Sequence, residues 1–210
     1  MISAHTFFDE RKFVLIDDFV SPSVASLIEQ RLLNNVSFAW NAAFHRDDFS
    51  TVKKEKWGPF ACHDAFLEGP QLCHSVVIQG QVVDRGELRM IEPLRKAASK
   101  YLGNLELQVD RCKYNLQFQR PGNAMGKFNC PHRDCKAHQI VMVYYVNDSD
   151  SRTYLFHDEA LNVISDVASK KGRAILFPGD MLHAGQHPIE SSIRCVINMN
   201  FTVSATDDLD

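Results

Sequence analysis

A histidine and an aspartate two positions apart, His132 and Asp134, form the pattern in this sequence with the clearest chemical meaning. On an extended segment alternate side chains point to one face, so this imidazole and carboxylate would project together. Both groups bind metals, and one more histidine would complete a facial triad. Such a triad leaves three positions of an iron ion open, as oxygen and a chelating co-substrate require. An isolated His-x-Asp pair is also common on protein surfaces, so it needs support from elsewhere in the chain.

Four histidines are candidates for the third ligand, namely His138, His157, His183 and His187. We choose His183, because it follows a strand-like segment and a Pro-Gly turn, and precedes Arg194 by eleven residues. Arg194 opens a strand that would lie beside His183, and its planar guanidinium can bind a carboxylate through two parallel hydrogen bonds. His187 is the reserve third ligand. A surface salt bridge is the competing interpretation of Arg194.

Composition bounds the class of protein. The chain has 210 residues, a formal net charge of −3, 45% hydrophobic and 23% charged residues. These values are ordinary for a soluble globular protein and do not indicate a general nucleic-acid binder. No basic start followed by an apolar run opens the sequence, and residues 140–146, the longest apolar stretch, are too few to span a bilayer. We therefore expect a cytoplasmic protein with no membrane partner.

The six cysteines do not form a Cys-x-x-Cys pair, so the usual spacing of a structural zinc site is missing. Free thiols in a reducing compartment are the simpler interpretation. The alternative, a zinc site made by the Cys62-His63 and Cys73-His74 pairs, has the wrong separation within each pair for a zinc knuckle.

The pattern along the chain favours a single domain, residues 1–210, of the α+β class. Residues 1–104 are expected to hold a short strand at 13–16, a helix that follows Ser21-Pro22 and a second helix at 87–101, whereas 35–85 show no clear pattern. Residues 105–119 alternate between apolar and polar types and short strand-like segments follow them, so 105–204 are expected to form a β-sandwich or barrel. The expected strands in this part are 105–119, 138–146, 153–157, 161–165, 174–177 and 193–203.

The stretch from Tyr114 to Phe201 resembles the double-stranded β-helix (jelly-roll) core of the iron(II)/2-oxoglutarate-dependent dioxygenases, in particular their prolyl 4-hydroxylase-like branch. The family shows an early tyrosine, an aromatic residue four before His-x-Asp, a Tyr-Leu-Asn strand end, a Gly-x-x-x-x-Phe segment, a distal histidine and a basic residue. The matching positions are Tyr114, Phe128, Tyr144-Tyr145-Val146-Asn147, Gly172, Phe177, His183 and Arg194.

Two departures concern the substrate. Residues 150–156 lack both glycines of the Gly-Gly-x-Thr-x-Phe segment that is usual in this branch. In addition, Arg194 stands where the animal collagen-modifying members have lysine. The resemblance therefore does not imply a collagen-like prolyl substrate.

The resemblance implies a hydroxylase that uses iron(II), 2-oxoglutarate and O2, with ascorbate as a further candidate cofactor. It would hydroxylate an unidentified peptidyl residue or small molecule and release succinate and CO2. His132, Asp134 and His183 would hold the metal and serve as the catalytic centre. Because halogenating relatives have a small residue in place of the carboxylate, Asp134 points to hydroxylation.

The same resemblance assigns the co-substrate contacts. Arg194 would bind the distal carboxylate of 2-oxoglutarate, and Tyr114 could donate a hydrogen bond to the same group. Core packing is the alternative for Tyr114. Asn115 and Gln117 alternate with it and would face the other way, and which face looks inward stays open.

Other interpretations stay open at this point. Arg133 could contact substrate, or be an ordinary solvated arginine. Residues 45–57 could form a lid over the site or a solvated charged loop. A cupin-like metal-binding protein is an alternative, although cupins need His-x-His where this chain has His-x-Asp. A non-catalytic binding module of the same fold is a further alternative.

Overall fold

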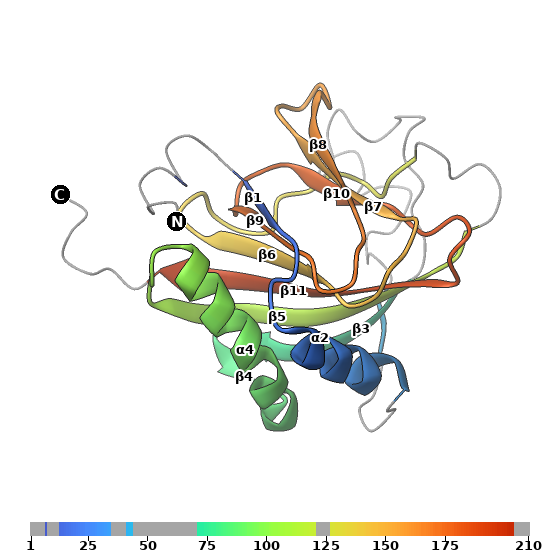
Figure 1. Ribbon diagram of the computed structural model, residues 1–210. Helices are drawn as coiled ribbons and strands as arrows, with labels where there is room; N and C mark the ends of the chain where they lie inside the picture. The colour runs from blue at the N-terminus through green and yellow to red at the C-terminus, as the bar shows by residue number, and fades with distance from the viewer. Residues whose placement is uncertain (1–6, 8–12, 35–40, 44–70, 121–126, 204–210) are drawn as a thin grey trace.

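The computed structural model describes Phe7 and residues 13–34, 41–43, 71–120 and 127–203. Within these ranges the chain forms two β-sheets with helices against one of them (Figure 1). The 45–57 segment and the Cys62-His63 pair lie outside the described residues. No helix in the described part of the chain is long and apolar enough to cross a membrane.

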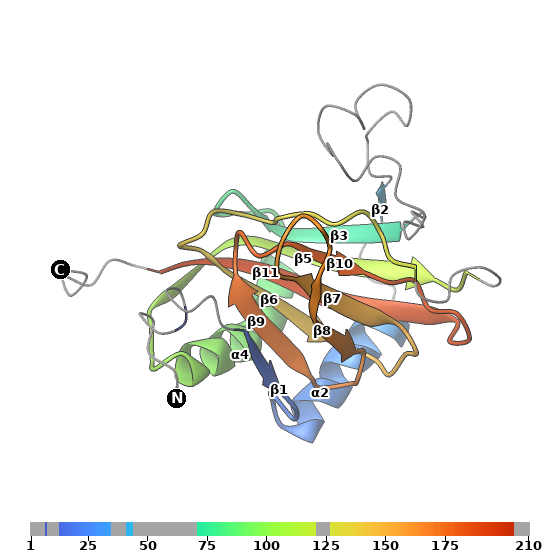
Figure 2. The same ribbon diagram turned by 90° about the horizontal axis from the view of Figure 1, so that it is seen from above.

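The two sheets are antiparallel and face each other. The larger sheet has the order β1-β9-β6-β11-β5-β3-β2, with β4 beside β3, and the smaller has the order β10-β7-β8 (Figure 2). The strands are β1 (Val14–Ile16), β2 (Asn41–Ala43), β3 (Gln71–Ile78), β4 (Gln81–Val82), β5 (Leu107–Phe118), β6 (Ile140–Tyr145), β7 (Arg152–Phe156), β8 (Val163–Ala168), β9 (Ala174–Pro178), β10 (His183–Gly185) and β11 (Ile193–Val203). The predicted sandwich is thus present in the C-terminal half.

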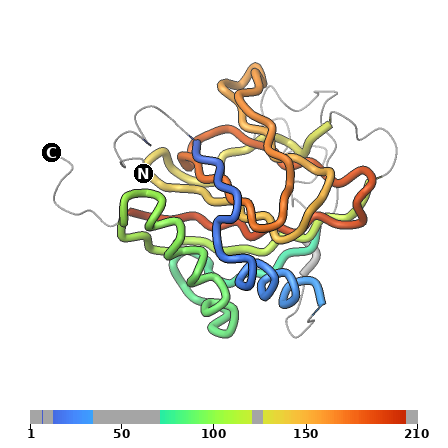
Figure 3. The backbone as a smooth tube through the Cα atoms, viewed as in Figure 1, coloured from blue at the N-terminus to red at the C-terminus, as the bar shows by residue number. Residues whose placement is uncertain are grey.

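Strands from both ends of the chain contribute to the larger sheet. The N-terminal β1 pairs with β9, which lies about 160 residues later along the chain, and Figure 3 shows the two segments side by side. The sheet also takes in β3, from the part of the sequence that showed no clear pattern. The N-terminal part is therefore built into the same sheet as the C-terminal strands.

Helices cover the face of the larger sheet that is turned away from the smaller sheet (Figure 1). Helix α2 (Pro22–Glu29) begins as its sequence predicts, with Ser21 as N-cap and proline in the first turn, and continues as a π-helix, η1 (Gln30–Asn34). Helix α4 (Arg85–Tyr101) is capped by Asp84, whose side chain accepts hydrogen bonds from the amides of Gly86 and Glu87. Both helices bury one apolar side on the sheet.

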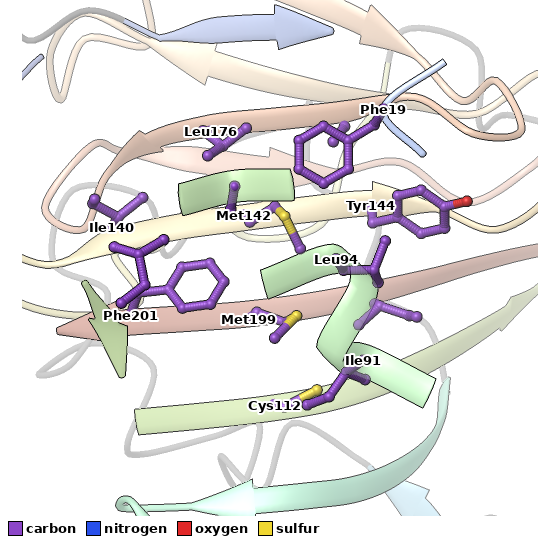
Figure 4. Close-up of a cluster of buried hydrophobic side chains, with 14 of the residues drawn as sticks. Phe19, Ile91, Leu94, Cys112, Ile140, Met142, Tyr144, Leu176, Met199 and Phe201 are labelled. Atoms are coloured by element: carbon purple, nitrogen blue, oxygen red, sulfur yellow. The ribbon is translucent and has the colours of Figure 1, made fainter. Parts of the chain in front are cut away.

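Two apolar layers follow from the alternation of side chains along the strands. One layer packs between the larger sheet and the helices and contains residues such as Leu94, Met142 and Met199 (Figure 4). The other packs between the two sheets, where Val143 of β6 meets Leu155 of β7. Because β6 is covered on both faces, all six of its residues are buried and its sequence is continuously apolar.

The link from β5 to β6 passes close to the turn after β9. The amide of Cys135 donates to the carbonyl of Gly179, and the amide of Gly179 donates to the carbonyl of Gln139. A Cβ at position 179 would overlap the Lys136 carbonyl and the Cys135 sulfur. Only glycine allows this approach, which places the residue after Asp134 against the turn.

Substitution of Gly179 by alanine is expected to push the 135–136 segment outward and to displace Asp134. We expect a loss of about 1–3 kcal/mol in the free energy of unfolding, as is typical of overpacking. Chemical denaturation and titration with Mn²⁺ would measure stability and metal affinity. Gly86→Ala, in the first turn of α4, is the control and should keep the metal affinity. A Gly179→Ala protein with parental stability and metal affinity would contradict this role.

Candidate metal centre

The structure brings His132, Asp134 and His183 together, and their ligand atoms all lie within 4.8 Å of one another. Nε2 of His132 lies 3.8 Å from Oδ1 of Asp134, and Nε2 of His183 lies 3.6 Å from Oδ2. The third ligand chosen from the sequence therefore lies beside the other two. Among the described residues this is the one group of three such ligands.

The backbone that carries the His-x-Asp pair differs from the prediction. It does not belong to a regular strand, because His132 forms only an isolated antiparallel bridge with His183. The two residues exchange hydrogen bonds of 2.9 and 3.0 Å between amide and carbonyl groups. This bridge places the two imidazole rings side by side, with centroids 4.4 Å apart.

Both histidines are held in the orientation that a metal needs. Nδ1 of His132 lies 3.2 Å from the carbonyl of Cys130, and Nδ1 of His183 lies 3.0 Å from the carbonyl of Met181. Since a carbonyl can only accept, each Nδ1 donates to it, so Nε2 is the ring atom that would bind a metal. Both Nε2 atoms face Asp134, and a backbone carbonyl on Nδ1 is common among metal-bound histidines.

Asp134 is a buried carboxylate with a donor on each oxygen. Nη1 of Arg111 lies 3.2 Å from Oδ1, and Nδ2 of Asn198 lies 2.8 Å from Oδ2. Burial alone would raise the pKa of Asp134, but its interaction with His183 and the charges of His132 and Arg111 hold the pKa well below its usual value. The group is therefore ionised at neutral pH, as a metal ligand must be.

The donor set fits a divalent transition metal. Two imidazoles and one carboxylate on adjacent backbone segments are the ligands of the facial triad that non-haem iron(II) occupies. Asn198 and Arg111 fix the carboxylate, as hydrogen-bonded partners do in many metal sites.

Arg194, at the start of β11, lies in the interior between the two sheets and is 5% exposed. Its guanidinium donates to Oε1 of Gln117 at 2.8 Å, and to hydroxyl oxygens of Thr153 at 2.8 Å and Ser169 at 3.3 Å. All three partners are neutral, and no carboxylate of the described residues pairs with Arg194. A buried cation without a counter-charge is costly, so this position suits an anionic ligand. The surface salt bridge weighed from the sequence is not formed.

Tyr145 is a further polar residue beside Arg194, and the sequence analysis did not select it. Its hydroxyl donates to Oγ1 of Thr153 at 2.8 Å, and the Arg194 guanidinium lies 5.8 Å from the centre of its ring. Burial raises the pKa of Tyr145, so the hydroxyl keeps its proton as a donor. A signal was present, because Tyr145 belongs to the Tyr-Tyr-Val-Asn segment that carried the family resemblance.

The predicted contact between Tyr114 and the co-substrate is wrong in this structure. The Tyr114 side chain lies in the helix-facing layer, and its hydroxyl donates to Oε2 of Glu87 on α4 at 3.2 Å. Glu87 in turn accepts from Nε of Arg31 at 2.8 Å. The face of β5 that looks toward the metal ligands instead carries Arg111 and Gln117.

The three other candidate histidines are not placed as ligands. His187, the reserve, is buried with Nδ1 lying 3.2 Å from the carbonyl of Phe118, and it does not join the group of three. His138 and His157 are exposed. Arg133 points to the surface, where its Nε donates to the carbonyl of Asp180 at 3.0 Å.

Cys130 and Cys135 flank the ligand pair. Both are free thiols, and Cys130 is buried. Burial raises the pKa of Cys135 to about 12, which makes it a weak nucleophile. Packing is the role that the structure supports for them.

Comparisons with known proteins were made at three levels. No family model matches the sequence, and no curated protein matches it. Solved structures do resemble it. A 2OG-Fe(II) oxygenase family oxidoreductase from Burkholderia pseudomallei aligns with a TM-score of 0.63 at 10% identity, over 95% of this chain and 88% of that one. A prolyl hydroxylase from Trichoplax adhaerens, in complex with a hypoxia inducible factor peptide fragment, aligns with a TM-score of 0.59 at 15% identity, over 97% and 93%.

A third similar structure has a different activity. The non-haem alpha-ketoglutarate-dependent epimerase SnoN from nogalamycin biosynthesis aligns with a TM-score of 0.61 at 10% identity, over 96% of this chain and 81% of that one. At these identities the likeness shows the fold. The chain has the fold of 2OG-Fe(II) oxygenases, prolyl hydroxylases among them, which confirms the resemblance predicted from the sequence at the level of the fold.

Replacement of His183 and of His187 by alanine separates the chosen ligand from the reserve. His183→Ala should lose measurable binding of Mn²⁺ or Fe²⁺, because one of three ligands is removed. His187→Ala should bind either metal with near-parental affinity. Calorimetric titration of anaerobic protein would measure both. Loss of binding in the His187 variant alone would show that the third ligand is assigned to the wrong histidine.

A Tyr114→Phe variant tests the corrected position of that residue. Removal of the hydroxyl leaves Oε2 of Glu87 without this donor, so the free energy of unfolding should fall by about 1–2 kcal/mol. Affinity of the metal-loaded protein for 2-oxoglutarate should not change. Urea denaturation and calorimetry would measure the two quantities. A parental stability together with weaker 2-oxoglutarate binding would restore the contact predicted from the sequence.

Proposed function

We propose that this chain is a non-haem iron(II)- and 2-oxoglutarate-dependent oxygenase, with its metal held by His132, Asp134 and His183. The observation that carries the proposal is the pairing of two features in one interior. One is a group of three candidate metal ligands, and the other is the buried cation Arg194, which has no carboxylate partner among the described residues. A keto acid with two carboxylates would chelate iron at one end and neutralise the arginine at the other.

The chain's own residues account for the binding of both groups. Iron, when bound, supplies the activation of O2 that protein side chains cannot provide. The two Nε2 lone pairs and the Asp134 carboxylate would hold it. Arg194 would bind the distal carboxylate of 2-oxoglutarate, with further donors from Thr153 and Tyr145. The apolar residues around Val143 and Leu155 would exclude water from the interior.

The whole chain would serve this activity as a single domain whose core is the double-stranded β-helix. O2 and 2-oxoglutarate would be consumed with release of succinate and CO2, and ascorbate is a candidate for maintaining the iron in its reduced state. Hydroxylation of a peptidyl residue or a small molecule is the outcome that we favour, because Asp134 supplies the carboxylate ligand. The similar epimerase structure shows why a product assay must test this choice.

The test uses metal and co-substrate before any substrate is known. Under anaerobic conditions, 2-oxoglutarate added to the Fe²⁺-loaded protein should produce a weak visible charge-transfer absorption, because it chelates the metal. Arg194→Gln should weaken 2-oxoglutarate binding by about 2–5 kcal/mol, at least roughly 30-fold, through loss of a buried ionic contact. The same variant should keep its affinity for Fe²⁺.

Arg152→Gln is the matched control, since Arg152 lies exposed on neighbouring β7 and pairs with Asp166. It should bind 2-oxoglutarate like the parent protein. Absence of the visible band in iron-loaded protein, with no succinate formed in the presence of any candidate substrate, would refute the oxygenase proposal and favour a cupin-like or non-catalytic metal-binding role.

A further inference from the structure

Among the described residues, the inner face of the larger sheet is less deeply buried on β5 than on β6 and β9. On β6 and β9 the residues that face the smaller sheet are buried, as Val143 and Ile175 show. On β5 the residues of the same face, Arg111, Lys113 and Asn115, are only partly buried, and the Arg111 side chain is 33% exposed. A substrate would therefore reach the metal across the face of β5.

The register of β5 and β11 places this open region relative to the co-substrate. Along the inner face of β11, Arg194 comes first, and Asn198, which contacts Asp134, lies four residues later, about 13 Å along the strand. Asn200 lies further from Arg194 and pairs across the sheet with Arg111. Lys113 pairs with Asn198. The pair Asn198–Lys113 is therefore level with Asp134, and the pair Asn200–Arg111 lies further from Arg194.

Two positively charged residues, Arg111 and Lys113, lie on this face of β5. Lys113 lies beside the thiol of Cys73 on β3, and no carboxylate of the described residues pairs with it. Arg111 pairs with Asp134, and a bound metal would share the negative charge of this carboxylate with Arg111. With iron(II) and the 2-oxoglutarate dianion bound, the charges of these two groups would cancel, and Arg111 and Lys113 together would exceed the single negative charge of Asp134. A further anion would offset this excess.

The same face also offers hydrogen-bond acceptors. The side-chain oxygens of Asn198 and Asn200 are buried and have no donor among the described residues. An unsatisfied buried amide oxygen costs about 1–3 kcal/mol, so a donor from a ligand would be favoured there. On the neighbouring strands, Asn198 lies opposite Lys113 and Asn200 lies opposite Arg111.

We propose that the substrate of this site carries an anionic group, a carboxylate or phosphate, that Lys113 and Arg111 bind. Next to this group the substrate carries an N–H or O–H donor, which hydrogen-bonds to the side-chain oxygens of Asn198 and Asn200. This inference rests on the proposed function, because it places the substrate relative to the metal and 2-oxoglutarate. It adds the substrate's chemical class, and it names specificity-determining residues on β5 and β11.

The experiment measures binding without turnover. Zn²⁺-loaded protein is saturated with N-oxalylglycine, a stable analogue of 2-oxoglutarate, and probed by ligand-observed NMR. The probes are matched pairs. One set compares N-acetyl amino acids with their uncharged amides, and the other compares sugar phosphates with the free sugars. The two sets distinguish a carboxylate from a phosphate. In at least one set the anionic member should bind about tenfold or more tightly than its neutral partner.

Variants identify the residue responsible. Lys113→Gln should lower the affinity for the anionic probe about tenfold or more. Lys113→Arg should recover most of this affinity because the charge is kept. The matched control is Lys96→Gln, which removes the same charge from the exposed face of α4 on the other side of the sheet. It should leave binding unchanged. A thermal melt of each variant reports whether the fold is kept.

The outcomes separate the two levels of the proposal. Equal binding of charged and neutral members, no binding of either set, or equal effects of Lys113→Gln and Lys96→Gln would overturn the anionic-substrate inference while N-oxalylglycine still binds. If N-oxalylglycine does not bind, the proposed function itself fails. In the Fe²⁺ enzyme, the anionic probe that binds should also raise succinate release. A neutral substrate that raises it equally would count against the inference.

Discussion

The antiparallel bridge between His132 and His183 is the contact on which the site depends. Two backbone hydrogen bonds join a segment between β5 and β6 to the first residue of β10, about fifty residues later in the chain. The bridge puts two imidazoles side by side and leaves Asp134 facing both. Each ring is then oriented by the carbonyl two residues before it. The close approach at Gly179 holds the same segment from its other end.

A second constraint is the cost of polar groups inside the sandwich. Arg194 is placed where three neutral oxygens accept from its guanidinium, and in the described part of the chain no carboxylate balances its charge. Val196 separates it along β11 from Asn198 and the metal ligands. The interior thus has a cationic end and a metal-binding end with apolar packing between them. A small dianion that chelates metal matches this distribution.

Strand β5 shows how one segment can serve stability and binding together. Cys112, Tyr114 and Leu116 pack toward the helices, where Tyr114 also reaches the buried carboxylate of Glu87. The alternate residues turn toward the group of His132, Asp134 and His183 and include Arg111 and Gln117. Helix packing therefore fixes the strand whose other face carries polar residues of the candidate site.

Local patterns in the sequence were sufficient for the strands β5 to β9 and β11, within a few residues, and for both helix starts, whereas the short strand β10 was not predicted. Alternation and capping residues depend on neighbours in the chain, so a sequence carries them directly. The ligand set was also predicted, because spacing and residue type limited the choice to few histidines. Strand β3 was not predicted, since its sequence has no clear alternation and its place depends on pairing with β5.

Which face of β5 looks inward was decided only by tertiary structure. Alternation shows that Tyr114 and Gln117 lie on opposite faces, but either face could meet the metal. The answer depends on α4 and on strands distant in the sequence, since these decide where the apolar side chains are buried. For the same reason the contact of Arg111 with Asp134, and the hydroxyls of Thr153 and Tyr145 beside Arg194, could not be read from spacing. They arise where segments far apart in the chain meet.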